Sequence, residues 1–312
     1  MTPLAALALC AALAQPVPIR ATPVPLDPRD PKRTVVGELE LLSGLALTST
    51  DRRFGGLSGM ALDGDVLTFV SDHGWWLRAA LLHDRDGRLT GLGPATLAPL
   101  ADRLGQKLRG DAEDAEEIVR LADGAFLVTF EHEQRLLRYD ARMTHPEPLP
   151  RPPGLEAAPA NGGLEALVLL SDGRLLAVSE KLKAPGGTLR GWILSTDGSS
   201  KGTLTYAIVD ELPPSGFTRL PDGDVLAVER KYRPGEGVTA RFARLRAADV
   251  TPGATLAGRE IARITGKMTA DNFEGLAARR DAAGRTILYV VSDDNYASDQ
   301  RTLLLQFALH RR

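Results

Sequence analysis

The sequence has little cysteine, no excess of basic charge and no long helical pattern. Its one cysteine, Cys10, lies in a segment that we expect to be removed, which excludes disulfides, thiolate metal sites and a cysteine nucleophile. Lys and Arg number 38 against 40 Asp and Glu, so we expect no binding of nucleic acid. With 21 prolines and 31 glycines, no 15-residue window keeps apolar residues at helical spacing. With 43% apolar residues, the pattern instead favours a folded all-β domain.

The N-terminal residues read as an export signal. Residues 1–14 are uncharged and apolar, end in Ala12-Leu13-Ala14, and are too short to span a membrane. We therefore expect a signal peptide over 1–14 and a periplasmic or secreted protein without a membrane span. Residues 15–33 contain six prolines and predict an extended, poorly packed leader. A single domain is predicted over residues 34–312.

One sequence unit recurs five times along this domain. Each copy reads as a loop, a short strand, an Asp-Gly type of turn, an apolar strand and an acidic residue, which is typical of a β-hairpin. The second strands LTFVS, FLVTF, LLAVS, VLAVE and ILYVVS are apolar enough to be buried on both faces. The copies cover residues 54–74, 114–133, 161–181, 213–232 and 271–295.

The repeats predict a β-propeller. More polar strands follow each hairpin, so that each repeat supplies one four-stranded blade. Taking Ser58, Glu117, Glu165, Ser215 and Glu274 as equivalent gives spacings of 59, 48, 50 and 59 residues. The last repeat leaves room for three strands only, so we expect residues 35–47 to pair with residues 302–309 and close the ring. Five blades are predicted, with six as the alternative if residues 75–113 or 233–270 fold more elaborately.

Acidic residues recur after the second strand of every repeat and at three of the five anchors. On equivalent strands around one axis they would lie at one opening, where carboxylates must be solvated, protonated, paired or bridged by a metal. Many hard oxygen ligands favour Ca²⁺, or alternatively Mg²⁺, over zinc. The alternative is structural: each acid accepts hydrogen bonds from the next blade and locks the two together. The acids after the second strands are Asp72, Glu131, Glu180, Glu229 and Asp293.

Several motifs resemble the phytase-like proteins of bacteria, the "esterase-like activity of phytase" family. The resemblance rests on GGLSGMAL (55–62) with VSDHG (70–74), on NGGLEALVLLSDGRLLAVSE (161–180), and on DNFEGLAARR (271–280) with VVSDDNY (290–296). It covers the chain from about residue 34 to the end. It implies an exported propeller that hydrolyses phosphoesters or other esters.

The hypothesis is a monomeric, calcium-dependent hydrolase of a small phosphoester or other anionic ligand. Lys181 and Arg230 would neutralise the phosphoryl charge beside Glu131 and Glu180, and these four are the candidate catalytic residues. A serine esterase using Ser58 and His73 is a weaker variant, because the chain lacks a nucleophile elbow. The other class is a non-catalytic envelope propeller that binds a ligand or a protein partner. The candidate metal ligands are Asp72, Glu117, Glu165, Glu229, Glu274, Asp293 and Asp294.

Overall fold

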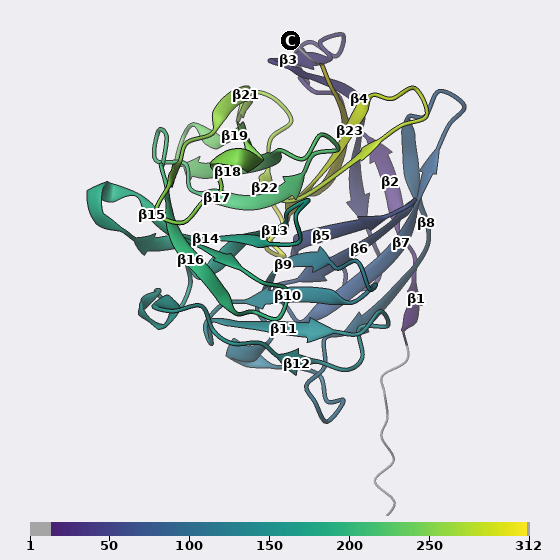
Figure 1. Ribbon diagram of the computed structural model, residues 1–312. Helices are drawn as coiled ribbons and strands as arrows, with labels where there is room; N and C mark the ends of the chain where they lie inside the picture. The colour runs from purple at the N-terminus through teal and green to yellow at the C-terminus, as the bar shows by residue number, and fades with distance from the viewer. Residues whose placement is uncertain (1–13, 311–312) are drawn as a thin grey trace, which may run out of the picture.

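The protein is a five-bladed β-propeller in a computed structural model that describes residues 14–310 (Figure 1). This confirms the predicted fold and blade number, because residues 75–113 and 233–270 add strands to existing blades and form no sixth sheet. The predicted signal peptide lies outside the described residues, except for Ala14. Within residues 14–310, no helix has the length and apolar character needed to cross a membrane.

Each blade is an antiparallel sheet whose first strand lies nearest the axis. The first blade contains β5 (Leu57–Asp63), β6 (Val66–Ser71), β7 (Trp75–His83) and β8 (Leu89–Pro99). The second contains β9 (Ala115–Arg120), β10 (Phe126–Phe130), β11 (Arg135–Tyr139) and β12 (Glu147–Pro148). Four 3-10 helices, at Gly110–Ala112, Leu155–Ala157, Pro185–Gly187 and Ala247–Asp249, are the helical elements of the described chain.

One short strand links the third and fourth blades. The third has β13 (Leu164–Leu169), β14 (Leu175–Lys183), β15 (Leu189–Leu194) and β16 (Ser200–Tyr206). The fourth has β17 (Pro214–Arg219), β18 (Val225–Arg233), β19 (Gly237–Leu245) and β21 (Arg259–Thr265). Between β19 and β21, the short β20 (Thr255–Leu256) reaches back and pairs in parallel with β16 of the third blade.

The fifth blade closes the ring as predicted. It contains β22 (Asn272–Arg280), β23 (Thr286–Asp293) and β24 (Thr302–Leu309), and its fourth strand is the N-terminal β4 (Leu39–Thr48). The pairing of β4 with β24 runs from Leu47 opposite Thr302 to Leu39 opposite Leu309, and β3 (Val35–Val36) pairs with β4. Because the two ends of the chain share one sheet, the ring has no open seam.

The expectation of a poorly packed leader is wrong. β1 (Gln15–Val17) pairs with β8 of the first blade, and β2 (Arg20–Pro23) pairs with β4 of the fifth. Val17 and Leu26 are buried. Edge strands tolerate proline because one of their edges makes no sheet hydrogen bonds. The leader is extended, but it covers the outer edges of two blades instead of hanging free.

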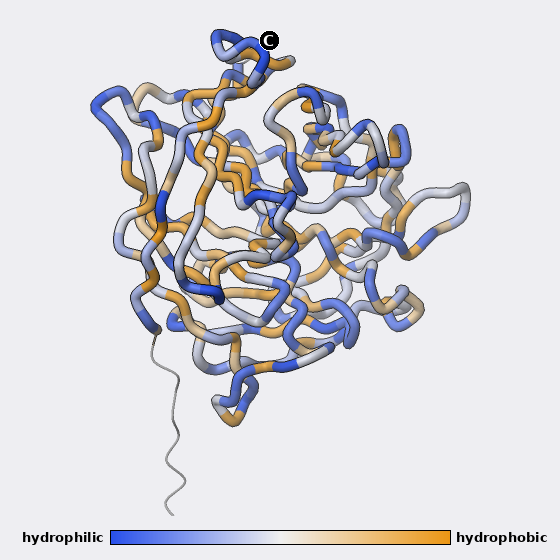
Figure 2. Tube along the Cα trace, turned by 180° about the vertical axis from the view of Figure 1, so that it is seen from behind, coloured by the Kyte–Doolittle hydropathy of each residue, from blue (hydrophilic) through white to orange (hydrophobic). Residues whose placement is uncertain are grey.

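The core lies between the blades. The second strands are buried throughout residues 67–71, 126–130, 175–179, 225–229 and 287–292, as the sequence predicted. Figure 2 shows their hydrophobic segments inside the molecule and hydrophilic loops at its periphery. Aromatic rings connect neighbouring blades: Phe242 lies 6.4 Å, between ring centroids, from both Phe273 and Phe307. Adjacent sheets therefore share one continuous apolar layer.

The inner strands pack closely around the axis because each carries a bulge followed, in four blades, by a small residue. The pairing between first and second strands shifts by one residue near the start of every inner strand. The next residue is glycine in three blades and alanine in one: Gly59, Ala166, Gly216 and Gly275. A Cβ atom on Gly216 would lie 1.9 Å from the carbonyl oxygen of Glu274 in the next blade.

Replacing Gly216→Ala should lower the free energy of unfolding by about 1–3 kcal/mol, because the fifth blade must move to make room. Gly91→Ala is the matched control, since the nearest atom to its new Cβ is 3.9 Å away. Urea unfolding of both variants measures the effect. Equal stability of the two would contradict the proposed packing constraint.

Candidate metal and catalytic site

The bulges place one residue per blade at the same level of one channel mouth. Strand pairing makes these residues Ser58, Glu116, Glu165, Ser215 and Glu274. The second-blade position is therefore Glu116, and the prediction of Glu117 is wrong by one residue. Counting back from the Asp-Gly turn identifies the correct residue, because Asp123 follows Glu116 by seven residues, just as Asp172 follows Glu165.

The same pairing defines a second ring at the ends of the second strands. Because Leu57, Ala115, Leu164, Pro214 and Phe273 pair with Ser71, Phe130, Ser179, Glu229 and Ser292, the residues that follow are equivalent. The second ring thus consists of Asp72, Glu131, Glu180, Arg230 and Asp293. Four of the five recurring acids share a ring as predicted. In the fourth blade the equivalent position belongs to Arg230 and not to Glu229.

Glu229 faces the interior between the blades and takes no part in the mouth. Its side chain is fully buried; the Tyr206 hydroxyl donates to Oε1 at 2.5 Å, and Arg241 donates to Oε2 at 2.5 Å. Both carboxylate oxygens are thereby occupied, which contradicts the predicted metal-ligand role. The sequence could not show this because Tyr206 and Arg241 lie on different strands, 23 and 12 residues away.

Three carboxylates at the second blade form the densest acidic group. One oxygen each of Asp114, Glu116 and Glu131 lie within 4.8 Å of one another. The backbone N–H groups of Gly162 and Gly163 donate to Oε1 of Glu131 at 2.5 and 2.6 Å, which fixes this side chain. Burial and the neighbouring acids raise the pKa values of Glu116 and Glu131. Among the described residues these side chains could hold a metal ion, and the sequence reasoning missed Asp114 and Glu116.

The carboxylates where the fifth blade meets the first, Asp72 and Asp293, also have raised pKa values. Burial, followed by repulsion from Asp293 and Asp114, raises the pKa of Asp72 to about 8. Burial and the charge of Asp294 raise the pKa of Asp293 to about 6, against hydrogen bonding from Asn295. Asp294 connects the fifth blade to the first. The Gly56 N–H donates to its Oδ1 at 2.9 Å, and Thr302 Oγ1 donates to its Oδ2 at 2.8 Å.

Two cations partly neutralise the mouth. Arg230 donates to Glu274 Oε1, and its own Nε is buried without a hydrogen-bond partner within residues 14–310. Lys181 Nζ lies 2.7 Å from Glu180 and 2.5 Å from Asn161 Oδ1. Arg230 lowers the otherwise raised pKa values of Glu165 and Glu274, which burial dominates. The predicted catalytic residues Glu131, Glu180, Lys181 and Arg230 are thus at one mouth.

The serine positions of the ring connect blades instead of offering a nucleophile. Ser58 Oγ donates to the carbonyl of Ala115 at 2.5 Å, and Ser215 Oγ donates to that of Phe273 at 2.9 Å. His73 contacts the Tyr296 ring at 4.3 Å and lies 3.5 Å from Asp72. Ser58 and His73 therefore form no nucleophile and base pair, which removes the serine-esterase variant.

Glu117 lies deeper, within the ring of inner strands. Its Oε1 accepts the backbone N–H of Ile118 at 3.0 Å, and N–H groups of Met60 and Phe217, from two other blades, also face this carboxylate. The residue is 2% exposed, and its Oε2 has no hydrogen-bond partner in the described part of the chain. Burial raises its pKa far above the usual value. Glu117 therefore occupies the channel below the acidic mouth.

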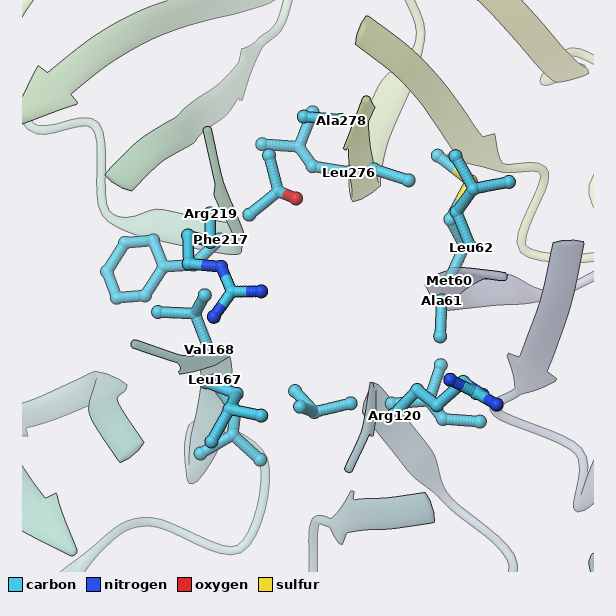
Figure 3. A pocket seen from close by; sticks show the side chains of 15 residues that line it. Met60, Ala61, Leu62, Arg120, Leu167, Val168, Phe217, Arg219, Leu276 and Ala278 are labelled. Atoms are coloured by element: carbon cyan, nitrogen blue, oxygen red, sulfur yellow. The ribbon is translucent and has the colours of Figure 1, made fainter. Parts of the chain in front are cut away.

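The opposite end of the channel has a different character. A cavity of about 150 Å³ is lined by the second halves of the inner strands, without an acidic side chain (Figure 3). Its lining is apolar apart from backbone, Thr218 and two arginines, and Figure 3 shows the Arg219 guanidinium directed into it. The carboxylate chemistry is thus confined to one end of the channel.

Family comparison fits this arrangement. The phytase-like family, described as "esterase-like activity of phytase", matches residues 52–296. The chain belongs to the phytase-like family. Both acidic rings of this phytase-like propeller lie within the matched residues, and the family supports a hydrolase-type propeller. No curated protein matches the chain.

Solved structures with a similar fold have low sequence identity. They include the PQQ-bound aldose sugar dehydrogenase of Streptomyces coelicolor, with 16% identity, 87% of this chain and 98% of that chain covered, and a TM-score of 0.49. The allergen Mala s 1 of Malassezia sympodialis has 14% identity, 92% coverage of each chain and a TM-score of 0.48. A putative gluconolactonase has 14% identity, 95% and 94% coverage, and a TM-score of 0.46.

The raised pKa values predict that, without divalent cations, stability falls as pH increases. The folded protein keeps protons on Asp293 up to about pH 6 and on Asp72 up to about pH 8, whereas the unfolded chain loses them near 3.8. The stability that these two protonated groups contribute is therefore fully present below about pH 4 and is lost as pH rises through their folded-state pKa values. Asp72→Asn should flatten the decrease between pH 6 and 8. Thermal unfolding in chelator measures this, and a wild-type midpoint that rises over the same range would contradict it.

Proposed function

We propose that this phytase-like propeller is a calcium-dependent hydrolase of phosphoesters. The single observation that carries the proposal is the acidic group of Asp114, Glu116 and Glu131 beside the cationic Lys181 and Arg230. The acids provide oxygen donors for a hard cation, and the two basic side chains attract an anionic substrate. Both sets open at one mouth of the propeller.

The donor set fits a calcium ion better than a softer metal. All three groups are carboxylates, and no thiolate or second histidine accompanies them among the described residues; His132 lies 3.0 Å from Asp114. Burial, together with repulsion among the neighbouring acids, raises the pKa values of Glu116 and Glu131, and a bound cation would relieve this repulsion. Calcium accepts six to eight oxygen ligands in flexible geometry, so irregular carboxylates and water can share it. A bound cation would supply charge stabilisation to the phosphoryl oxygens.

The chain's own residues have complementary roles in this reaction. Arg230, whose Nε lacks a partner, and Lys181 bind and orient the phosphoryl group. Glu180 lies at the mouth beside Lys181, with its side chain 12% exposed, and is placed to accept a proton from the attacking water. The water oxygen bonds to phosphorus and the bond from phosphorus to the leaving oxygen breaks. The leaving oxygen takes up a proton from solvent, and Glu180 returns its proton to solvent. The products are phosphate and an alcohol.

Replacing Glu116→Gln together with Glu131→Gln should lower calcium-dependent phosphatase activity by about 100-fold or more. Glutamine at 131 keeps an oxygen for the amides of Gly162 and Gly163, so folding is preserved. Turnover of p-nitrophenyl phosphate with calcium and with chelator measures the effect. Glu147→Gln, an exposed carboxylate on β12, is the control.

Activity of the double variant equal to that of wild type would contradict the proposed site. A calcium-dependent rise in the melting temperature of wild type without any turnover would instead support a non-catalytic propeller that binds an ion or ligand. The hydrogen bonds from Gly162 and Gly163 to Glu131 favour this non-catalytic alternative, because they give Glu131 a role in connecting two blades.

We also propose that the protein is exported and acts as a monomer in the periplasm or medium. The support is the uncharged segment 1–14 with its small residues before Gln15. N-terminal sequencing of the protein from the periplasmic or extracellular fraction tests export, and a chain that still begins at Met1 would contradict it.

A further inference from the structure

Two long hairpins form a groove beside the acidic mouth. β14 and β18 have nine residues each, whereas β6 has six and β10 has five. In the third and fourth blades the second strand therefore continues past the mouth and turns at a Pro-Gly pair. The two segments have similar sequences, VSEKLKAPGG (178–187) and VERKYRPGEG (228–237). They lie on neighbouring blades and enclose a cavity of about 620 Å³.

The groove connects directly with the proposed catalytic site. Glu180, Lys181 and Arg230 line both the mouth and the groove. A phosphoryl group held by Lys181 and Arg230 would thus direct the rest of its ester toward the groove. This geometry assigns the groove to the leaving group of the substrate.

The lining has an apolar wall and a charged rim, in which the basic Lys181, Lys183, Arg230 and Lys231 outnumber the acidic Glu180 and Glu211. Ile208, Pro213 and Tyr232 supply apolar surface, and the Tyr232 side chain is large and 64% exposed. Lys231 is paired with Glu211 at 2.8 Å. Lys183 is exposed, and its ammonium group has no ion pair among the described residues. An exposed aromatic ring beside unused positive charge complements a flat apolar ring that carries an anionic ester.

We propose that the phosphoester substrate has an aromatic leaving group, which binds in this groove against Tyr232. The proposal rests on the phosphoester hydrolysis proposed above and adds the class of substrate. The phosphoryl group lies between Lys181 and Arg230, and the ring stacks on Tyr232 between the two hairpins. Tyr232 is then a specificity residue that contacts the leaving group and does not act on the phosphorus atom.

The test compares two inert phosphonates, because their binding can be measured without turnover. In the presence of calcium, phenylphosphonate should bind wild-type protein about tenfold more tightly than methylphosphonate by calorimetry. Tyr232→Ala should abolish the difference by weakening only phenylphosphonate, and Tyr232→Phe should retain it because the ring remains. The exposure of Tyr232 makes both variants compatible with folding.

Equal affinity of wild type for the two phosphonates, or an unchanged difference in Tyr232→Ala, would overturn the aromatic assignment while leaving phosphoester hydrolysis in place. Failure of both phosphonates to bind would overturn the assignment together with the proposed function. Hydrolysis of p-nitrophenyl phosphate by Tyr232→Ala should show a raised KM and a nearly unchanged kcat, whereas glycerol 2-phosphate should show neither change.

Discussion

Close packing of the five inner strands around the axis is the constraint on which the rest of the structure depends. Gly216 lies so near Glu274 of the next blade that no side chain fits between them, and Gly59 and Gly275 are similarly confined. Contact at this distance requires a ring without gaps, which β4 completes beside β24. Once the ring is closed, the bulged residues must lie at one level. Their side chains then meet at one mouth, although they are far apart in sequence.

The same closure creates an electrostatic problem that the protein only partly solves. Arg230 replaces an acid in the second ring and pairs with Glu274, and backbone amides hold Glu131 and Asp294. These contacts connect neighbouring blades. Asp294 illustrates the structural interpretation of the acids, whereas Glu131 combines this structural role with a place in the acidic group of Asp114 and Glu116. Burial and the neighbouring acids raise the pKa values of Asp72 and Glu116, and no Lys or Arg within residues 14–310 forms an ion pair with either carboxylate. The uncompensated charge is what a calcium ion would neutralise.

Local patterns predicted the fold well and the site only in part. The Asp-Gly turns and apolar strands determined the blades, and the short last repeat predicted the pairing of residues 35–47. A bulge adds one residue to an otherwise regular pair, so choosing between Glu116 and Glu117, or between Glu229 and Arg230, required strand register. Asp114 lies in a loop. The hydrogen bonds that Tyr206 and Arg241 donate to Glu229 come from strands distant in sequence. Contacts of that kind leave no local signal in sequence.

If the buried carboxylates at one mouth carry part of their charge uncompensated, they should bind a divalent cation. Calorimetric titration of calcium at pH 7, repeated in buffers of different ionisation enthalpy, tests it most directly because it counts protons released on binding. We expect saturable binding with release of protons, both greatly reduced in the Glu116→Gln, Glu131→Gln double variant. Absence of binding, or binding that releases no proton and is unchanged in that variant, would contradict it.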